Sequence, residues 1–193
     1  MISEQEAYLL GFLHAARTPG QPVIRHRDKE VMEEAAKWLS AACERRKIPH
    51  VRLHHPEQAL HGMEEEISLL LPPEIIREID APLKEIFDRF RPFQADLERG
   101  ILEGCGTLCY KKSTRSMGIS FTSFDRRWLE ALRREVLQHH PCDPIKKTER
   151  GSYWFSIDEA VTRSYADWLY GDPNTPHSHA RRRKLQQVLG QLK

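Results

Sequence analysis

The segments "YLLGFLHAA" (residues 8–16) and "LERGILEGCG" (residues 97–106) decide the fold of this chain. Each has the apolar pattern of a buried helix, yet each has a glycine in its interior, where glycine costs roughly 1 kcal/mol relative to alanine. In both segments a second small residue follows four positions after the glycine. Residues four apart lie on one helix face, and small residues there let two helix backbones approach closely. We therefore expect these two helices to pack on each other through Gly11, Ala15, Gly100 and Gly104.

The order of helices and strands that follows the second segment is repeated, with one loss, after the first. From residue 93 onward, the residue pattern predicts a helix, a hairpin, a helix capped by Asp125 and a second hairpin turning at Gly151. A helix capped by Asp158 and a basic helix from about His177 complete this half. Before residue 93 we expect the same order, with the first hairpin reduced to about one strand.

Two spacings support a tandem repeat. Gly11 and Gly100 lie 89 residues apart, whereas Asp28 and Asp125, each expected to cap the helix that follows it, lie 97 residues apart. The second spacing is longer by 8 residues (97 − 89), and these residues fall where the second half has its first hairpin. The sequence therefore predicts an α+β fold of two tandem α-β-β-α-β-β-α lobes, residues 1–92 and 93–193, related by a pseudo-twofold axis.

Composition favours an intracellular globular protein. With 193 residues, 39% of them apolar, the chain can bury a sizeable core. No segment approaches the ~20 consecutive apolar residues of a membrane span, and the N-terminus lacks the order of a signal peptide. Four cysteines in a chain of this length fit a reducing compartment better than a disulfide scaffold. We expect a cytoplasmic monomer with no membrane partner.

The resemblance to a known family rests on an ordered set of segments. "LLGFLHAAR" (9–17) and "ERGILEGCG" (98–106) resemble the paired nine-residue motifs of the LAGLIDADG homing endonucleases. "ISFTSFDRRWLEALRREV" is similar to that family's strand-then-helix segment, and "ADWLYGDPNTPHSHARRRKL" to its closing stretch. The resemblance covers nearly the whole chain and is strongest after residue 93. It implies a single-chain pseudo-dimer in which two antiparallel sheets flank the paired helices and form a saddle that lies on duplex DNA.

The resemblance also implies where metal ions would bind. In that family an acidic residue at the eighth motif position, at the end of each paired helix, holds a divalent metal beside the scissile phosphates. The matching residues here are Ala16 and Cys105. Alanine offers no ligand, and cysteine sulfur is a poor ligand for Mg²⁺, which prefers carboxylate oxygens. We therefore expect no residue with the family's catalytic role.

The neighbouring motif positions are not expected to replace the missing metal ligands. The sixth positions hold His14 and Glu103, but Glu103, the fallback acid, points roughly 200° away from the eighth position on an ideal helix. Arg17 is expected to place a positive charge near the metal position. The histidine clusters lack the paired Cys and His spacing of a zinc site. We expect no metal and no cofactor, and Mg²⁺ only if other acids restore an endonuclease.

The expected DNA-binding surface is concentrated in the second half of the chain. Residues 1–92 carry 13 Lys and Arg against 16 Asp and Glu, a net charge of −3, whereas residues 93–193 carry 17 against 12, a net charge of +5. Basic strand ribbons suit the major groove, where Arg and Lys reach phosphates and guanine edges. The candidate DNA-binding residues are Arg25, Arg27, Arg52, Lys111, Lys112, Arg115, Lys146, Lys147, Arg150, Arg181, Arg182, Arg183 and Lys184.

The sequence favours a nuclease-dead relative of this family that binds specific duplex DNA, as a transcription regulator would. It leaves open an active site-specific DNA endonuclease with unusual metal ligands and an RNA-binding, maturase-like splicing factor. Because the first half is poorer in candidates and carries the acidic run 64–66, its lobe is expected to bind DNA more weakly, or to bind structured RNA or a protein.

Overall fold

The computed structural model describes residues 3–17, 21–26, 29–48, 52–54, 67–111, 115–172, 174, 176–177 and 179–191. In the first half of the chain the elements follow the expected order. They are α1 (Glu4–Ala16), β1 (Val23–His26), α2 (Lys29–Arg46), β2 (Arg52–His54), β3 (Ile67–Leu70), α3 (Pro73–Ile79) and α4 (Leu83–Arg89). A short 3₁₀ helix, η1 (Arg91–Phe93), leads into the second half.

The second half begins with the second motif helix and has a complete first hairpin. Its elements are α5 (Gln94–Cys105), β4 (Gly106–Lys111), β5 (Ser116–Ser123), α6 (Arg126–Leu137), β6 (Lys146–Lys147), β7 (Tyr153–Ser156), α7 (Thr162–Tyr170) and α8 (His179–Gln191). Where the second half has the hairpin of β4 and β5, the first has the single strand β1, as the spacing of the repeat predicts.

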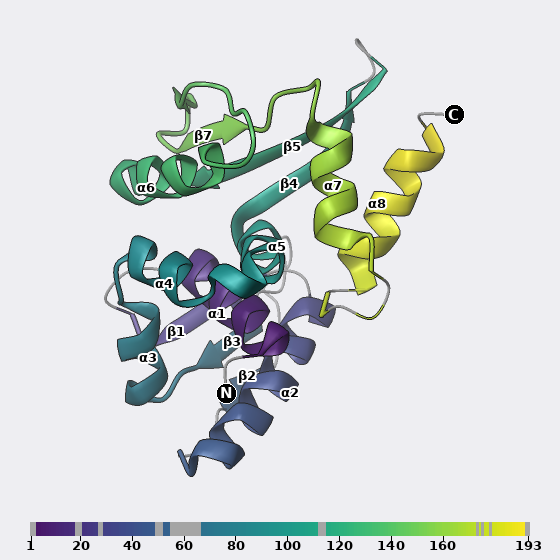
Figure 1. Ribbon diagram of the computed structural model, residues 1–193. Helices are drawn as coiled ribbons and strands as arrows, with labels where there is room; N and C mark the ends of the chain where they lie inside the picture. The colour runs from purple at the N-terminus through teal and green to yellow at the C-terminus, as the bar shows by residue number, and fades with distance from the viewer. Residues whose placement is uncertain are drawn as a thin grey trace, which may run out of the picture.

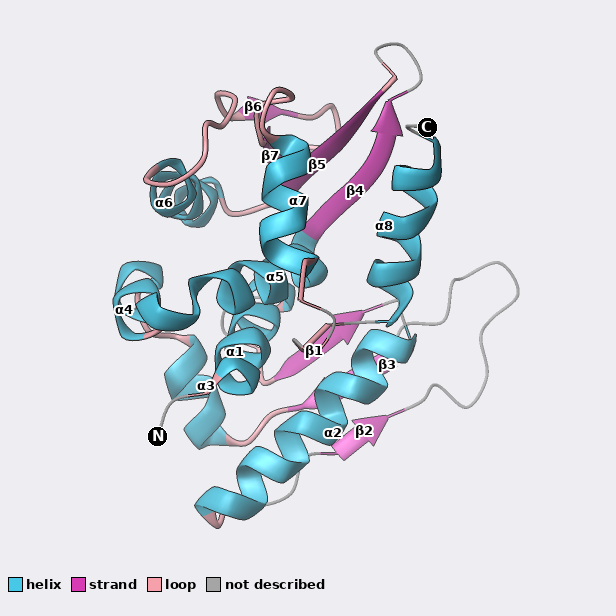
Figure 2. Cartoon of the chain, turned by 45° about the vertical axis from the view of Figure 1, so that its right-hand side comes forward, coloured by secondary structure: helices cyan, strands magenta, loops and turns pink. Residues whose placement is uncertain are grey.

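Two antiparallel sheets lie on either side of the central helices α1 and α5 (Figures 1 and 2). The first sheet has the strand order β1-β3-β2, and the second has the order β4-β5-β7-β6. Ile24 and Leu69 are paired and fully buried in the first sheet, as are Phe121 and Phe155 in the second. Alternate residues point to opposite faces of a strand, so each sheet has one face packed on helices and one open face. The α+β fold with two sheets and paired helices is confirmed.

The glycines lie where α1 and α5 touch. A Cβ added to Gly100 would overlap the carbonyl oxygen of Tyr8 and lie 2.8 Å from the backbone nitrogen of Phe12. A Cβ added to Gly11 would overlap the carbonyl oxygen of Leu97 in the same way. Here, backbone contacts backbone, and there is no flexible side chain that could move aside. The close approach of the two helices therefore requires residues without a side chain at both positions.

The expected helix caps differ in outcome. Asp125 caps α6, since its carboxylate accepts hydrogen bonds from the backbone nitrogens of Arg127 (2.9 Å) and Trp128 (3.1 Å). The cap expected at Asp158 is wrong, because α7 begins only at Thr162 and the Asp158 carboxylate instead accepts from the nitrogen of Ala160 in the preceding turn. The cap expected at Asp28 lies outside the described residues. Within the described chain, no helix is long and apolar enough to cross a membrane.

Candidate nucleic-acid interface

The paired helices end side by side, at Ala16 and Cys105. A Cβ added to Gly104 would lie 3.1 Å from the backbone nitrogen of Ala16, so the two ends approach each other closely. Both sheets start here, because β4 begins at Gly106 and the backbone of Arg17 pairs with β1. We call Ala16, Arg17, Cys105 and Gly106 the foot of the paired helices.

The foot does not fit the magnesium ions of the family's cleavage chemistry, which activate water and stabilise the leaving oxygen. Ala16 has no donor atom in its side chain. Burial raises the pKa of the Cys105 thiol to about 12, so this side chain is a neutral thiol at pH 7 and a poor ligand. Among the described residues, no three His, Cys, Asp or Glu side chains are grouped to hold a metal ion.

Glu103, the fallback acid, lies in the interior. Its side chain is fully buried, and its carboxylate accepts hydrogen bonds from the hydroxyls of Tyr8 in α1 and, at 3.2 Å, Tyr170 in α7. Burial and the nearby Glu103 carboxylate hold the pKa values of both tyrosines well above their usual range, so both donate as neutral phenols. The position of Glu103 ties three helices together and keeps its carboxylate away from solvent.

His14, the matching sixth-position residue of α1, ties its helix to the other lobe. Its Nδ1 accepts a hydrogen bond of 2.9 Å from the indole nitrogen of Trp128 in α6, and the two rings stack with centroids 5.9 Å apart. Burial lowers the pKa of His14, which favours the neutral imidazole that this bond requires. The sixth motif positions thus both join a central helix to a neighbouring helix.

The positive charge of Arg17, expected near the metal position, is paired with a carboxylate. Its guanidinium binds both carboxylate oxygens of Asp80, with Nη1 at 2.5 Å and Nη2 at 3.2 Å, and its Nε donates to the carbonyl of Gln21. Its side chain is only 4% exposed. A bidentate ion pair of this kind fixes the direction of the guanidinium, which here points toward the turn between α3 and α4.

The open face of the second sheet carries small polar residues and an aromatic ring. Thr107 pairs with Ser120 across β4 and β5, and Thr122 pairs with Trp154 across β5 and β7. Paired residues of antiparallel strands point to the same face, so these four side chains form one surface opposite the buried Phe121. Such a surface can present hydrogen-bonding groups to base edges.

Lys146 and Lys147 separate onto the two faces of this sheet. Lys146 pairs with Trp154 on the open face, and its Nζ lies 5.2 Å from the centre of the indole ring. Lys147 pairs with Tyr153 on the opposite face, with its Nζ 5.9 Å from the phenol ring. Both side chains are exposed, but only Lys146 belongs to the open face, so the two DNA-binding candidates of β6 differ in orientation.

The tip of the first hairpin and the turn of the second carry further cations. Lys111 lies on the open face, with its side chain next to Gly118, and makes a partly exposed ion pair of 3.3 Å with Glu159. Arg115 is exposed in a left-handed turn conformation, and Arg150 is exposed beside the turn. Lys112 lies outside the described residues. Exposed ion pairs contribute little to stability, so Lys111 can exchange Glu159 for a phosphate at small cost.

The first sheet offers a more apolar open face. Arg25 is exposed and pairs with Ser68, and Leu70, which is 39% exposed, pairs with Val23. Arg52 holds the register position opposite Leu70 in β2. Arg27 and the acidic run 64–66 lie outside the described residues. Among the described positions, the apolar Leu70 and Val23 occupy part of the surface where the second sheet has polar side chains.

The arginines of the C-terminal basic cluster make contacts within the protein. Arg181 donates to the carbonyl of Gly106 at the foot (2.8 Å), and Arg182 lies 3.2 Å from the Nε2 of His177. Arg183 reaches across to α2, where it makes a 2.6 Å ion pair with Glu30. Arg181 is therefore better described as stabilising the C-terminal end of α5 than as a free phosphate contact. Lys184 is exposed.

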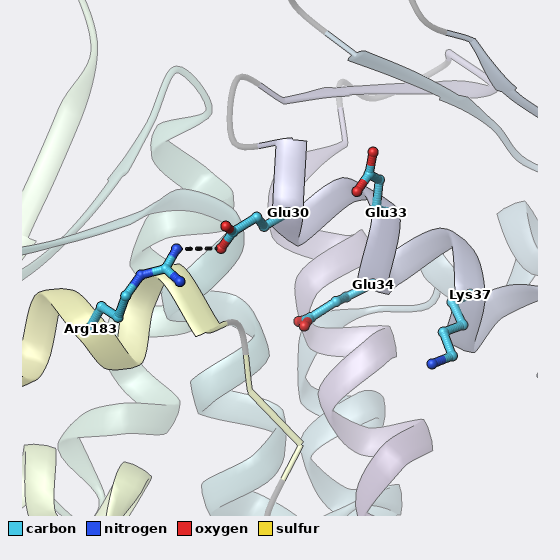
Figure 3. A pocket seen from close by; sticks show the side chains of 5 residues that line it. All are labelled: Glu30, Glu33, Glu34, Lys37 and Arg183. Atoms are coloured by element: carbon cyan, nitrogen blue, oxygen red, sulfur yellow. Dashed lines mark hydrogen bonds and ion pairs between the residues drawn. The ribbon is translucent and has the colours of Figure 1, made fainter.

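Arg183 borders an acidic hollow between α8 and α2 (Figure 3). The hollow has a volume of about 270 Å³ and is lined by Glu30, Glu33, Glu34, Lys37 and Arg183. Three carboxylates against two cations give it a net negative charge. The hollow itself is therefore unfavourable for a phosphate group.

The structure also brings together a cavity that the sequence pattern did not indicate. It has a volume of about 410 Å³ and lies between the end of α1, the α3–α4 turn and the beginning of α6. Its lining includes His14, Arg17, Asp80, Asp125 and Trp128. These residues come from three separate segments, so only the long-range packing assembles them. The sequence singled out His14, Arg17 and Asp125 separately, as motif residues and a helix cap, but gave no indication that they meet.

The family model described as "Putative archaeal homing endonuclease", of the LAGLIDADG type, matches residues 81–193. Among solved structures, I-DmoI in complex with DNA and Mn is 13% identical to this chain, with a TM-score of 0.59 over 88% of this chain and 97% of the other. I-DmoI in complex with DNA and Ca gives 11% identity and a TM-score of 0.62 over 95% and 97% of the two chains. No curated protein sequence matches the chain significantly.

A second group of similar structures comes from DUF199/WhiA. Its N-terminal LAGLIDADG domain is 13% identical, with a TM-score of 0.54 over 87% of this chain and 84% of the other. In full-length DUF199/WhiA from Thermotoga maritima the match covers all of this chain but 62% of that protein. At such identities these likenesses show the fold alone. The family model spans more than half of the chain, and the paired helices and two sheets are in place, so this protein belongs to the LAGLIDADG homing endonuclease family.

Proposed function

We propose that this protein binds a specific duplex DNA sequence through the open faces of its two sheets and does not cut it by the family's metal-dependent mechanism. The observation that carries the proposal is the contrast between the intact fold and the altered foot. Gly11 and Gly100 keep the two helices in contact, while Ala16 and Cys105 stand where carboxylates would be needed.

The surface chemistry supports DNA as the partner. The second sheet combines exposed Lys146 and Arg115 with Thr107, Thr122 and Trp154 on or beside one open face. Cations of this kind bind phosphates, and the side chains between them can read base edges in the major groove. Two of the solved structures with this fold are I-DmoI in complex with DNA, which agrees with the same use of the saddle here.

The position of Glu103 argues against a rescued nuclease. A catalytic carboxylate must reach the metal and the attacking water, whereas Glu103 is fully buried and bound to Tyr8 and Tyr170. Binding without cutting is the property that a transcription regulator requires, and we propose that role. An active endonuclease and a maturase-like RNA-binding protein are the alternatives that the experiment below separates.

The experiment is a selection of bound sequences from a random duplex pool, carried out with the full chain in EDTA and again in Mg²⁺. We expect the same sequence to be enriched under both conditions and to be recovered intact. Nicked or cut product that requires Mg²⁺ would instead identify an endonuclease. Binding of structured RNA in preference to any selected duplex would identify the splicing factor.

Charge-reversal variants test which sheet dominates binding. Reversing Lys111 and Lys146 should weaken binding of the selected duplex more than reversing Arg25 and Arg52 does, given the +5 and −3 charges of the two halves. Equal losses from the two pairs would show that both lobes contribute alike and would overturn the proposed asymmetry.

A further inference from the structure

Phe124 is the most exposed large hydrophobic residue in the part of the chain that the structure describes. Its exposure is 79%, whereas the other exposed large hydrophobic side chains among the described residues reach only 39%. It stands between the end of β5 at Ser123 and the cap of α6 at Asp125. Single exposed apolar residues are common on protein surfaces, so exposure alone does not indicate a binding site.

Phe124 lies at the foot of the paired helices. Phe121, three residues earlier, pairs with Gly106 at the end of α5, and a strand advances about 3.3 Å per residue, so Phe124 lies about 10 Å along the β5 direction from that pair. Its two neighbours, Ser123 and Asp125, line the same cavity as Ala15 and Arg17 of the first lobe. The backbone of Phe124 is therefore near the end of α1 as well as that of α5, and its ring, which does not line the cavity, points to solvent.

The backbone on both sides of Phe124 is held in place. Ser123 Oγ accepts a hydrogen bond of 3.1 Å from the backbone nitrogen of Asp125, and the Asp125 carboxylate accepts from the nitrogens of Arg127 and Trp128. Trp128 in turn donates to His14 of the other lobe. The ring is thus attached to a backbone whose conformation is fixed before any partner binds, which is the property of a preorganised binding residue.

Charge beside the ring favours a polyanionic partner. Arg126 and Arg127, in the first turn of α6, are both exposed, and the Arg127 side chain borders the cavity at the foot. Arg126 makes an exposed 2.8 Å ion pair with Glu130 and lies over the Tyr153 ring, so Arg127 is the cation nearer the foot. An aromatic ring beside an exposed cation can insert between stacked bases while the cation contacts a neighbouring phosphate. An apolar protein partner would gain less from two adjacent arginines.

We propose that Phe124 is an apolar wedge that partly unstacks a central base step of the bound duplex. This inference rests on the proposed function. If the two sheets occupy successive turns of the major groove on one side of the duplex, the minor groove faces the point between them. Apolar side chains inserted from the minor groove kink DNA by about 20–90°, which lets the duplex contact more of the protein surface on either side.

The wedge is tested with the selected duplex carrying 2-aminopurine at each central position in turn, and with donor and acceptor dyes at its two ends. Wild-type protein should raise the 2-aminopurine fluorescence at one step and shorten the distance between the dyes. Phe124→Ala should still bind the duplex, since Lys146 and Arg115 remain, but should lose both signals. Phe124→Leu should keep both, because leucine also serves as a wedge.

Leu137→Ala is the matched control, since Leu137 is an exposed apolar residue at the other end of α6 and should leave both signals unchanged. Retention of the fluorescence change by Phe124→Ala would overturn the wedge, and so would its absence from a wild-type complex whose binding is measured independently. Failure of the wild-type protein to bind any duplex would instead contradict the proposed function itself.

Discussion

Lys146 and Lys147 are adjacent in β6 yet point to opposite faces of the four-stranded sheet, because Lys146 pairs with Trp154 and Lys147 with Tyr153. They have the same charge and similar exposure. The proposed DNA-binding surface contains only the first of them, so the pair provides an internal control for the orientation of the sheet on its ligand.

Lys146→Ala should weaken duplex binding and reduce the slope of log affinity against log salt by about one unit, since one phosphate contact is lost. Lys147→Ala should leave the slope close to that of the wild-type protein. Titrations of the selected duplex at several salt concentrations measure both slopes. A larger effect at Lys147 would place DNA on the opposite face of the sheet.

Gly100→Ala should destabilise the fold by about 1–3 kcal/mol or more, the usual range for added volume in a packed core. The new Cβ would meet the backbone of Tyr8 and Phe12, so the two helices would have to separate. Gly190→Ala is the control, because nothing lies within 4 Å of a Cβ at that exposed position in α8, and it should stabilise by up to about 1 kcal/mol. Urea denaturation gives both values, and a more stable Gly100→Ala protein would contradict the observed packing.

Glu98 should make stability depend on pH. Its carboxyl group is fully buried between Gln94 and Tyr165, and burial raises its pKa to about 7 from the ordinary 4.5. A raised pKa means that the folded protein binds the proton more tightly than the unfolded chain, so the stability present below pH 4.5 is lost as pH rises toward 7. The loss amounts to about 3 kcal/mol.

Glu98→Gln removes this titration, because glutamine cannot ionise. The free energy of unfolding of the variant relative to that of the wild-type protein should therefore rise between pH 5 and pH 8, by about 2.5 kcal/mol. Denaturation of both proteins at the two pH values gives the difference, in which contributions from all other groups cancel. The exposed Glu85 supplies the control substitution, Glu85→Gln. A difference that does not change with pH would show that Glu98 is already ionised in the folded protein at pH 5, so that burial does not raise its pKa.

Ala16→Asp combined with Cys105→Asp should create the carboxylate pair that the foot lacks. We expect binding of the selected duplex to become tighter in Mg²⁺ than in EDTA, because two hard oxygen ligands attract the metal to the interface. The wild-type protein should bind equally well under both conditions. The two single variants are the controls and should show a smaller Mg²⁺ effect. Mg²⁺-dependent cleavage by the wild-type protein that is lost in Glu103→Gln would contradict the proposed inactivity.

The sequence by itself determined the elements and their repetition. Alternating apolar residues in β5 and β7 fix which face of each strand is buried, and Gly11 and Gly100 mark the helices that must meet closely, because only glycine lets backbones approach that far. The absence of acidic residues at the eighth motif positions, Ala16 and Cys105, could also be predicted from the sequence, because the residue type at a known motif position is sufficient for that conclusion.

The tertiary structure alone decided which charged side chains are engaged in contacts within the protein and which remain available to a ligand. Arg17 and Asp80 lie 63 residues apart in the chain and form a bidentate pair, Arg181 binds the carbonyl of Gly106, and Glu103 is enclosed by Tyr8 and Tyr170. Local periodicity places a side chain on a face of its own element but carries no information about what another element brings to that face. Long side chains reach partners that are set by helix packing and sheet register, so the contacts of charged residues had to come from the folded protein.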